Sequence, residues 1–328
     1  MLVIQIEKNH LKQKKLRFNM KILGIGNAIV DVICKVDEIF LTNNKLTKST
    51  MKLVDEKEFQ KLLANLNIEK TIAGGSVANS IVGLSQLKNE VSFIGKVNND
   101  QLGNDYEKSL INENVKYCYS KKNESTPTGT CLILITPDSE RTMCTFLGIA
   151  GKITPQDIDD DSINKNDLIF LEGYLWDEGE PKAAFEKAIS IAKKSAMSLS
   201  DQFCVDRHKK SFFDLVKNKL DITFANEQEI ISLIDAKSFE EVIDFGKSLN
   251  KLLVITRGEK GSIAIKDGVL NECESDKDLN LVDLTGAGDL FASGFLHGYI
   301  TNKSIPECLA KGKEMASKII QKIGARLN

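Results

Sequence analysis

Short apolar runs rich in β-forming residues alternate along this chain with amphipathic stretches of helical length, and this alternation constrains the fold more than any other feature. We predict strands in the apolar runs at residues 21–26, 91–95, 167–171, 196–200, 221–225 and 252–256. We predict helices in the stretches at residues 56–66, 76–87, 101–112, 181–194 and 239–249. Strands that alternate with helices form a mostly parallel sheet covered by helices on both faces. The sequence therefore predicts a three-layer α/β/α domain.

Two stretches interrupt the alternation, at about residues 32–54 and 116–147. They contain strand-like runs, such as residues 130–135 and 141–146, with turn residues between them and little helical period. We expect both stretches to be inserted in one domain and to pair into a small separate sheet.

Composition restricts the classes of partner. The 328 residues, 42% of them hydrophobic, can fill a large core, and a net charge of −2 without a basic cluster argues against nucleic-acid binding. The cysteines include no CxxC pair, so neither a zinc site nor a disulfide framework is predicted. No apolar run approaches the ~20 residues of a membrane-spanning helix. We expect a cytoplasmic protein that binds a small molecule and no membrane; its oligomeric state is left open.

The lysine-rich residues 1–19 precede Met20, which stands directly before the first predicted strand. We expect this segment to be a disordered extension, with a basic arm for a partner as the alternative. The folded domain is then predicted at residues 20–328.

The most informative motif is Asp-Leu-Thr-Gly-Ala-Gly-Asp at residues 283–289. Phe291, Phe295 and Tyr299 follow at intervals of four residues, which predicts a helix that begins at the glycines and buries one face. Free N–H groups in the first turn of such a helix, together with its dipole, bind anions, and glycines allow a phosphate to approach the backbone. Asp289 would lie beside that anion as a general base, although first-turn acids often only stabilise the helix dipole.

Further motifs have the same order as in a known family. They are Gly-Ile-Gly-Asn-Ala-Ile-Val-Asp at 24–31, Ala-Gly-Gly-Ser-Val-Ala-Asn at 73–79, Gly-Lys-Val-Asn-Asn-Asp-Gln-Leu-Gly at 95–103 and Pro-Thr-Gly-Thr-Cys at 127–131. With the motif at 283–289, the chain resembles the ribokinase-like (PfkB) carbohydrate kinases over nearly all of residues 20–326, and within that family the adenosine kinases most. The resemblance implies a ribokinase-like α/β/α domain with a small β-sheet lid.

The resemblance also implies roles for individual residues. The catalytic residues would be Asp289 with Gly286, Ala287 and Gly288, and the acceptor would be bound by Asn27, Asp31, Gly74, Gly75, Asn79 and Tyr174. ATP would be bound by Asn226, Thr256, Gly258, Gly261 and Arg141, and Glu229 would organise Mg²⁺ through water. A monovalent cation such as K⁺ is a further candidate cofactor. The sequence departs from the family where Leu284 replaces the usual Thr, and where Tyr174 and Leu175 replace a phenylalanine pair that stacks the nucleobase; with Trp176, they are expected to shape the choice of acceptor.

Simpler structural interpretations exist for most of these residues. Asp31 could be an ordinary acid at the end of a strand, and residues 74–76 could form a simple turn into a helix. Asn226 with the acids after it could be a helix cap. Residues 256–261 could be a β-hairpin turn, and Arg141 a solvated hairpin residue.

The function that we predict is transfer of the γ-phosphoryl group of ATP to a primary hydroxyl, first of adenosine at its 5′-position, and second of a sugar such as ribose or fructose. A dinucleotide-binding GxGxxG is incomplete because Ile29 stands where the third glycine is needed, and GxxxxGK[ST] does not occur. A non-catalytic nucleotide sensor is the alternative from another class. The joint presence of Asp289, Asn226 and Glu229 argues against it.

Overall fold

The larger of two sheets has nine strands, in the order β14-β13-β12-β11-β10-β9-β1-β5-β6. The computed structural model describes residues 20–138, 140–177 and 180–327, so the extension predicted at residues 1–19 lies outside the described residues. In sheet order the strands are Val269–Cys273, Ser262–Lys266, Leu252–Thr256, Ile222–Asn226, Ser195–Ser198, Leu168–Glu172, Ile22–Ile25, Val91–Ile94 and Lys116–Tyr117. The strands from β12 to β6 run parallel, whereas β12, β13 and β14 pair antiparallel.

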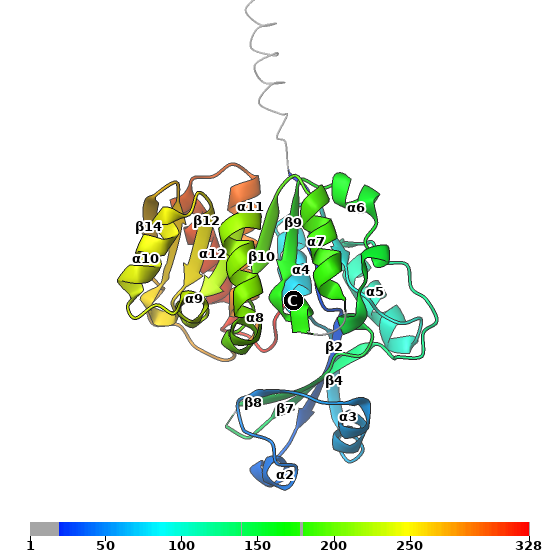
Figure 1. The fold of residues 1–328 in the computed structure, drawn as a ribbon. Helices are drawn as coiled ribbons and strands as arrows, with labels where there is room; N and C mark the ends of the chain where they lie inside the picture. The colour runs from blue at the N-terminus through cyan, green and yellow to red at the C-terminus, as the bar shows by residue number, and fades with distance from the viewer. Residues whose placement is uncertain (1–19, 139, 178–179, 328) are drawn as a thin grey trace, which may run out of the picture.

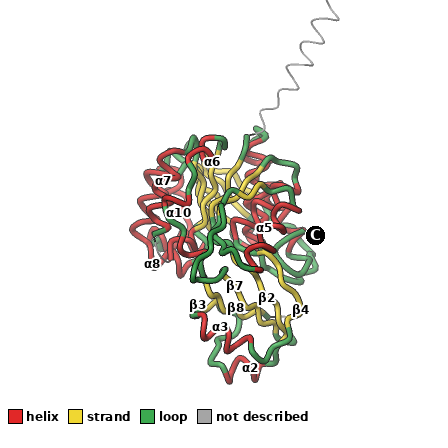
Figure 2. Tube along the Cα trace, turned by 90° about the vertical axis from the view of Figure 1, so that its right-hand side faces the viewer, coloured by secondary structure: helices red, strands yellow, loops and turns green. Residues whose placement is uncertain are grey.

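Helices cover both faces of this sheet because its strands are apolar on both faces. Ile22 and its register partners Val91 and Leu168 are buried in one hydrophobic cluster, whereas the next residue, Leu23, is buried in the other. The first face packs against α4 (Ser76–Gln86), α5 (Gln101–Asn112), α11 (Ala287–Ile300) and α12 (Ile305–Ile319). The second face packs against α6 (Asp160–Asn164), α7 (Pro181–Ile191), α8 (Gln202–Asp214), α9 (Glu227–Ile234) and α10 (Phe239–Ser248). Figures 1 and 2 show the resulting three layers, which confirm the predicted fold class.

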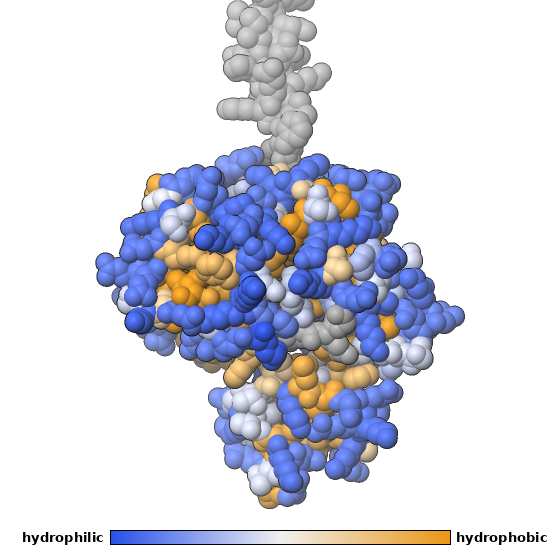
Figure 3. Space-filling view, viewed as in Figure 1, coloured by the Kyte–Doolittle hydropathy of each residue, from blue (hydrophilic) through white to orange (hydrophobic). Residues whose placement is uncertain are grey.

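The smaller sheet has five strands in the order β3-β8-β7-β2-β4 and projects from one end of the large one (Figure 1). Its strands are β3 (Met51–Leu53), β8 (Arg141–Phe146), β7 (Gly129–Ile135), β2 (Ile29–Lys35) and β4 (Ile68–Ala73). The helices α2 (Glu38–Asn43) and α3 (Glu56–Leu63) pack on one face of it through alternate residues such as Val32, Leu132 and Cys144. In Figure 3 hydrophilic residues dominate the visible face, and a waist separates the two parts of the protein.

The bounds predicted for the inserted segments need correction. The first segment extends beyond residue 54, because α3 and β4 also belong to the small sheet and its covering helices. The second begins later than residue 116, because Lys116–Tyr117 pairs with β5 in the large sheet. Helical periodicity alone assigned residues 56–66 to the large domain, but their apolar face, which includes Phe59 and Leu62, packs on the small sheet instead.

Short helical turns connect several of the elements. They are the 3-10 turns η1 (Ala150–Lys152), η2 (Pro155–Asp157), η3 (Gly173–Asp177) and η5 (Gly258–Lys260) and the π-helical turn η4 (Leu215–Lys219). Within the described ranges no helix is long and apolar enough to cross a membrane.

Helix α11 packs unusually closely against α12. A Cβ atom added to Gly294 would lie 2.3 Å from the carbonyl oxygen of Lys311 in α12. Phe291 and Phe295 fill the space between this helix pair and the sheet, as their four-residue spacing predicted.

We therefore expect Gly294→Ala to lower the free energy of unfolding by about 1–3 kcal/mol, because the added methyl group forces the two helices apart. In a helix with free space the same change stabilises by about 1 kcal/mol, so the sign of the effect distinguishes the two cases. Unfolding in urea measures the change in the free energy of unfolding. Lys318→Ala, on the exposed side of α12, is the control and should change stability by less than about 0.5 kcal/mol. A more stable Gly294→Ala protein would contradict the close packing.

Candidate active site

The candidate site lies where the parallel strands of the large sheet end at their carboxyl ends, on the side of the small sheet. Ligands of open α/β sheets bind at this edge. Glu172, the last residue of β9, is only 1% exposed there. It accepts hydrogen bonds from Asn27 Nδ2 at 3.1 Å and from the backbone N–H of Val77 at 2.9 Å. Glu172 thus joins the end of β1 to the first turn of α4.

Glu172 was missed by sequence reasoning, because an acid at the end of a strand carries no distinctive signal. Burial raises its pKa to about 7, although its hydrogen bonds oppose the shift. Gly26 is required beside it, since an added Cβ atom would lie 2.5 Å from Glu172 Oε2. Asn27, a predicted acceptor ligand, is buried with its Oδ1 atom lacking a partner among the described residues, so that oxygen is available to a ligand.

Asp289 lies in the first turn of α11 and is held by the first turn of α4. Its Oδ1 accepts a hydrogen bond from Ser76 Oγ at 2.6 Å, and its Oδ2 accepts one from Asn79 Nδ2 at 3.1 Å. Burial raises its pKa to about 6, while the two hydrogen bonds favour the ionised form. The carboxylate is therefore fixed in orientation and ionised at neutral pH. This arrangement exceeds what a helix-stabilising acid requires, because both oxygens are held by another helix.

The turn that precedes Asp289 leaves its backbone open. Gly286 has a φ of +78°, which favours glycine, and starts the helix without a hydrogen bond from any capping side chain. Gly288 is exposed, and an added Cβ atom there would meet no described atom within 4 Å. Space beside bare amides and the positive end of a helix dipole suits an anion.

Asp31 approaches the same region from β2 of the small sheet. The glycine pair makes this approach possible, since a Cβ atom on Gly74 would lie 2.4 Å from Asp31 Oδ2. Gly75 has a φ of +95°, and its added Cβ atom would lie 2.2 Å from the Asn27 carbonyl oxygen. Residues 74 and 75 therefore do more than make a turn: they bring the acid of the small sheet against the start of α4.

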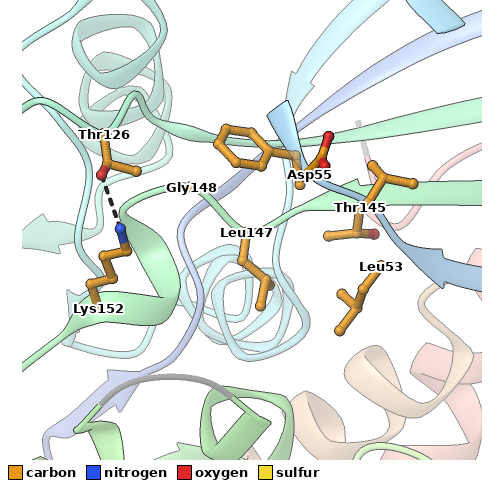
Figure 4. A pocket seen from close by; sticks show the side chains of 9 residues that line it. Leu53, Asp55, Thr126, Thr145, Leu147, Gly148 and Lys152 are labelled. Atoms are coloured by element: carbon orange, nitrogen blue, oxygen red, sulfur yellow. Dashed lines mark hydrogen bonds between the residues drawn. The ribbon is translucent and has the colours of Figure 1, made fainter. Parts of the chain in front are cut away.

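A pocket of about 300 Å³ lies between the small sheet and the large domain (Figure 4). It is lined by Leu53, Val54, Asp55, Thr126, Thr145, Phe146, Leu147, Gly148 and Lys152. Thr145 pairs with Cys131 across the sheet, and Cys131 pairs with Asp31, so the three side chains share one face. Leu53, the register partner of Thr145, lies on this face too, whereas Phe146 points to the opposite face and packs against Phe59.

Arg141, at the start of β8, connects the small sheet to the loop before α11. Its Nη2 lies 2.5 Å from Asp283 Oδ2, and its Nη1 donates to Thr285 Oγ1 at 3.2 Å. Its side chain is only 12% exposed, so Arg141 is not the solvated hairpin residue of the alternative interpretation. Arg141 thus contacts the loop of the glycine motif, and its predicted contact with a phosphate of ATP stays a prediction.

The residues predicted for the nucleotide lie at the ends of β11 and β12. Asn226 is paired with Thr256 in the sheet register, and it caps α9 by accepting from the Glu229 N–H at 2.8 Å. Glu229 in turn accepts from Asn226 Nδ2 at 2.6 Å and from the Asn226 N–H at 2.9 Å. Asn226 and Glu229 therefore cap the N-terminus of α9, as the helix-cap interpretation held. Because both oxygens of this buried carboxylate have partners, Glu229 fits Mg²⁺ only through water.

The loop after Thr256 is a β-hairpin turn, as one sequence interpretation held. Arg257 N donates to the Gly261 carbonyl oxygen at 2.8 Å, and Gly261 has a φ of +83°. Gly258, with a φ of +57°, would meet nothing within 4 Å if a Cβ atom were added, so it leaves space at the strand end.

Tyr174 follows the end of β9, and its backbone N–H donates to Ser200 Oγ at 3.1 Å. Burial raises its pKa, so the phenol stays protonated at neutral pH. The expectation that Leu175 and Trp176 shape the choice of acceptor was wrong. They are 1% and 8% exposed and belong to the hydrophobic cluster beneath the helical layer. In the part of the chain that the structure describes, no group of three or more His, Cys, Asp or Glu residues could hold a metal ion.

The pKa of Asp31 can be tested through the pH dependence of protein stability. Burial raises its pKa to about 7, because desolvation outweighs Arg326 and Arg141. A carboxyl group with a raised folded-state pKa contributes stability below its unfolded-state pKa, and this stability is lost as the pH rises through the folded-state pKa. We therefore expect Asp31→Asn to melt well above the unsubstituted protein at pH 8, and the difference to shrink steadily as the pH falls from 7 to 4.

Thermal unfolding of the ligand-free protein across this pH range measures the difference. Asp244→Asn, an exposed position in α10, is the matched control and should follow the unsubstituted protein at every pH. If the difference between Asp31→Asn and the unsubstituted protein did not change with pH, the pKa of Asp31 would not be raised in the folded protein.

Comparison with known proteins agrees with this geometry. A crystal structure of adenosine kinase from Sinorhizobium meliloti superimposes with a TM-score of 0.88 and 34% identity, over 94% of this chain and 96% of that one. Adenosine kinase 2 of Arabidopsis thaliana is 26% identical over 92% of this chain and 94% of its own length. An uncharacterized sugar kinase of Archaeoglobus fulgidus is 30% identical over 75% of this chain and 97% of its own length. The model of the pfkB family of carbohydrate kinases matches residues 21–328, and the chain therefore belongs to this family of ribokinase-like, ATP-dependent kinases.

Proposed function

We propose that this kinase transfers the γ-phosphoryl group of ATP to the 5′-hydroxyl of adenosine, with Asp289 as the general base. The observation that carries the proposal is the position of Asp289, which is fixed by α4 beside an open glycine turn and on the side of the sheet that Asp31 approaches. The hydroxyl proton passes to Asp289 as the oxygen bonds to the γ-phosphorus. The bond from that phosphorus to the bridging oxygen breaks, and ADP leaves.

The pKa of Asp289 suits this role. A base is most effective when its pKa lies near the working pH, and burial raises this one to about 6. The group is thus ionised at neutral pH and still able to accept a proton. General-base catalysis of this kind accelerates a reaction by about 10²- to 10⁴-fold.

The phosphates and the acceptor are assigned to opposite sides of the residues 286–288 turn. The Ala287 N–H donates to the Leu284 carbonyl oxygen at 3.2 Å, so the amides of Gly286 and Gly288 would bind the transferred phosphoryl group, assisted by Arg141. The rest of ATP would lie along Asn226, Thr256, Gly258 and Gly261. Mg²⁺, held by the phosphates and through water by Glu229, would neutralise negative charge on the nucleotide. Closure of the small sheet would exclude water and so limit hydrolysis of ATP.

The pocket in Figure 4 favours a nucleoside over a sugar as acceptor. Leu53, Phe146 and Leu147 give it apolar walls, against which a flat base packs better than a ring of hydroxyl groups. Asn27, Asp31 and the Gly74–Gly75 backbone would bind the ribose hydroxyls. The adenosine kinases among the similar proteins support the same acceptor. Ribose or another sugar is the second candidate, supported by the similarity to a sugar kinase.

We expect Asp289→Asn to lower kcat by at least about a hundredfold while the KM values for ATP and the acceptor change little, because the variant keeps the shape of the base but cannot take the proton. Steady-state ADP formation measures this effect. The exposed Asp244→Asn is again the control and should keep full turnover. Near-native turnover of Asp289→Asn would remove Asp289 from the role of base.

A panel of acceptors tests the substrate. We expect ADP formation to depend on adenosine, with a lower kcat/KM for ribose and fructose, in assays with Mg²⁺ and with or without K⁺. Product analysis should find the phosphate on the 5′-oxygen. A preference for a sugar would support the second candidate. Nucleotide binding without ADP formation from any acceptor would favour a sensor instead.

A further inference from the structure

The C-terminal segment returns to the candidate active site after α12. The Gly324 N–H donates to Asp283 Oδ2 at 2.7 Å, and an added Cβ atom on Gly286 would lie 2.7 Å from the Ala325 backbone. Figure 2 shows this end of the chain near α5. Two backbone contacts therefore fix Arg326 beside the glycine turn that starts α11.

The guanidinium group of Arg326 is buried, and one of its nitrogens has no partner. The residue is only 8% exposed. Its Nε donates to Asn79 Oδ1 at 3.1 Å, and its Nη1 lies 3.5 Å from Ser109 Oγ. Its Nη2 is buried without a hydrogen-bond partner among the residues described. A buried charged donor that lacks an acceptor is costly, so its presence points to a ligand that supplies one.

Asn79 connects Arg326 to the base. The same amide group accepts from Arg326 through Oδ1 and donates to Asp289 Oδ2 through Nδ2. Because Arg326 can only donate, it fixes which end of the amide faces Asp289. Without Arg326 the amide could turn, and its oxygen would then face the carboxylate oxygen and repel it.

Four titratable groups act on the pKa of Arg326 and favour its charged form, although burial lowers that pKa. Asp31 approaches from the small sheet and Asp289 from α11, while Tyr106 and Glu113 belong to α5 and its end. The guanidinium group thus interacts with Asp31, the candidate acceptor ligand, and with Asp289, the candidate base. Its free nitrogen is available to an oxygen of a molecule bound between those acids.

We propose that Arg326 is an acceptor-site residue, which positions Asp289 through Asn79 and donates a hydrogen bond from Nη2 to an oxygen of the bound acceptor. This inference rests on the proposed phosphoryl transfer and adds to it a residue from the last turn of the chain. Arg326 also lowers the pKa of both Asp31 and Asp289 and so favours their ionised forms. The other groups that face Asp289 are Asp31, Glu172 and Tyr174, and Arg141 faces Asp31.

Two substitutions of Arg326 distinguish the effect of its charge from the effect of its hydrogen bonds. We expect Arg326→Gln to raise the KM for the acceptor by about 10- to 100-fold, as is usual when a hydrogen bond from a charged group is lost, and to lower kcat. The KM for ATP should stay within about twofold. The acid limb of kcat/KM should move to higher pH, because Asp31 and Asp289 lose a neighbouring positive charge.

Arg326→Lys keeps the charge and loses the planar fork. It should therefore raise the KM for the acceptor while the acid limb stays near its original pH. Ser109→Ala removes only the weak outer contact of Arg326 and should leave both KM values and the pH profile unchanged. An unchanged KM for the acceptor together with an unchanged pH profile in Arg326→Gln would overturn the proposal, even if its melting temperature falls.

If the Arg326→Gln protein does not fold, the Arg326→Lys protein tests the proposal. A raised KM for the acceptor with an unchanged KM for ATP supports the proposal, and an unchanged KM for the acceptor overturns it. The unsubstituted protein is assayed in parallel with adenosine and the sugars. If it forms no ADP with any acceptor, the proposed function fails. If it is active and Arg326→Lys keeps the acceptor KM, only the role of Arg326 fails.

Discussion

The contact between the first turns of α4 and α11 is the constraint on which the candidate site depends. Both helices begin at glycines, and they pack so closely that a Cβ atom on Gly83 would lie 2.5 Å from Ser293 Oγ. Ser80 Oγ donates to the Asp289 carbonyl oxygen at 2.9 Å, and the single proton of Ser293 Oγ is shared between that oxygen, at 2.9 Å, and the Ser80 carbonyl oxygen, at 2.8 Å. Ser80 and Ser293 thus hold the two helices together near their N-terminal ends, and these contacts fix the position of the Asp289 carboxylate.

The site places acidic groups where water is scarce. Burial raises the pKa of Asp31, Glu172 and Glu229 to about 7, and that of Asp289 to about 6. Ionising these groups costs stability, and this cost rises with pH between the unfolded-state and folded-state pKa values. Such an arrangement is typical of functional sites, where the pKa is matched to the chemistry rather than to stability.

Three separate parts of the chain meet at Asp283. Its side chain, which is only 6% exposed, binds Arg141 of the small sheet and accepts hydrogen bonds from the N–H groups of Thr285 and Gly324. The small sheet, the loop before α11 and the C-terminal segment are therefore connected through one carboxylate. A movement of the small sheet that breaks the Arg141 ion pair would release a restraint on the glycine turn, so the small sheet is physically connected to that turn.

The sequence by itself determined the layered α/β fold, because each apolar run and each amphipathic stretch must bury its own apolar face. Glycine turns before helices also leave a local signal, which made residues 74–75 and Asp289 candidates, whereas Asp31 became a candidate only through the resemblance to a known family. The sequence could not assign α3 to the small sheet, since periodicity tells which face is buried but not against which partner. Only the tertiary structure placed Leu175 and Trp176 in the core, and only it revealed Glu172 and Arg326. These residues gain their significance from contacts across 145 and 247 positions of sequence, and nothing in their local surroundings records such contacts.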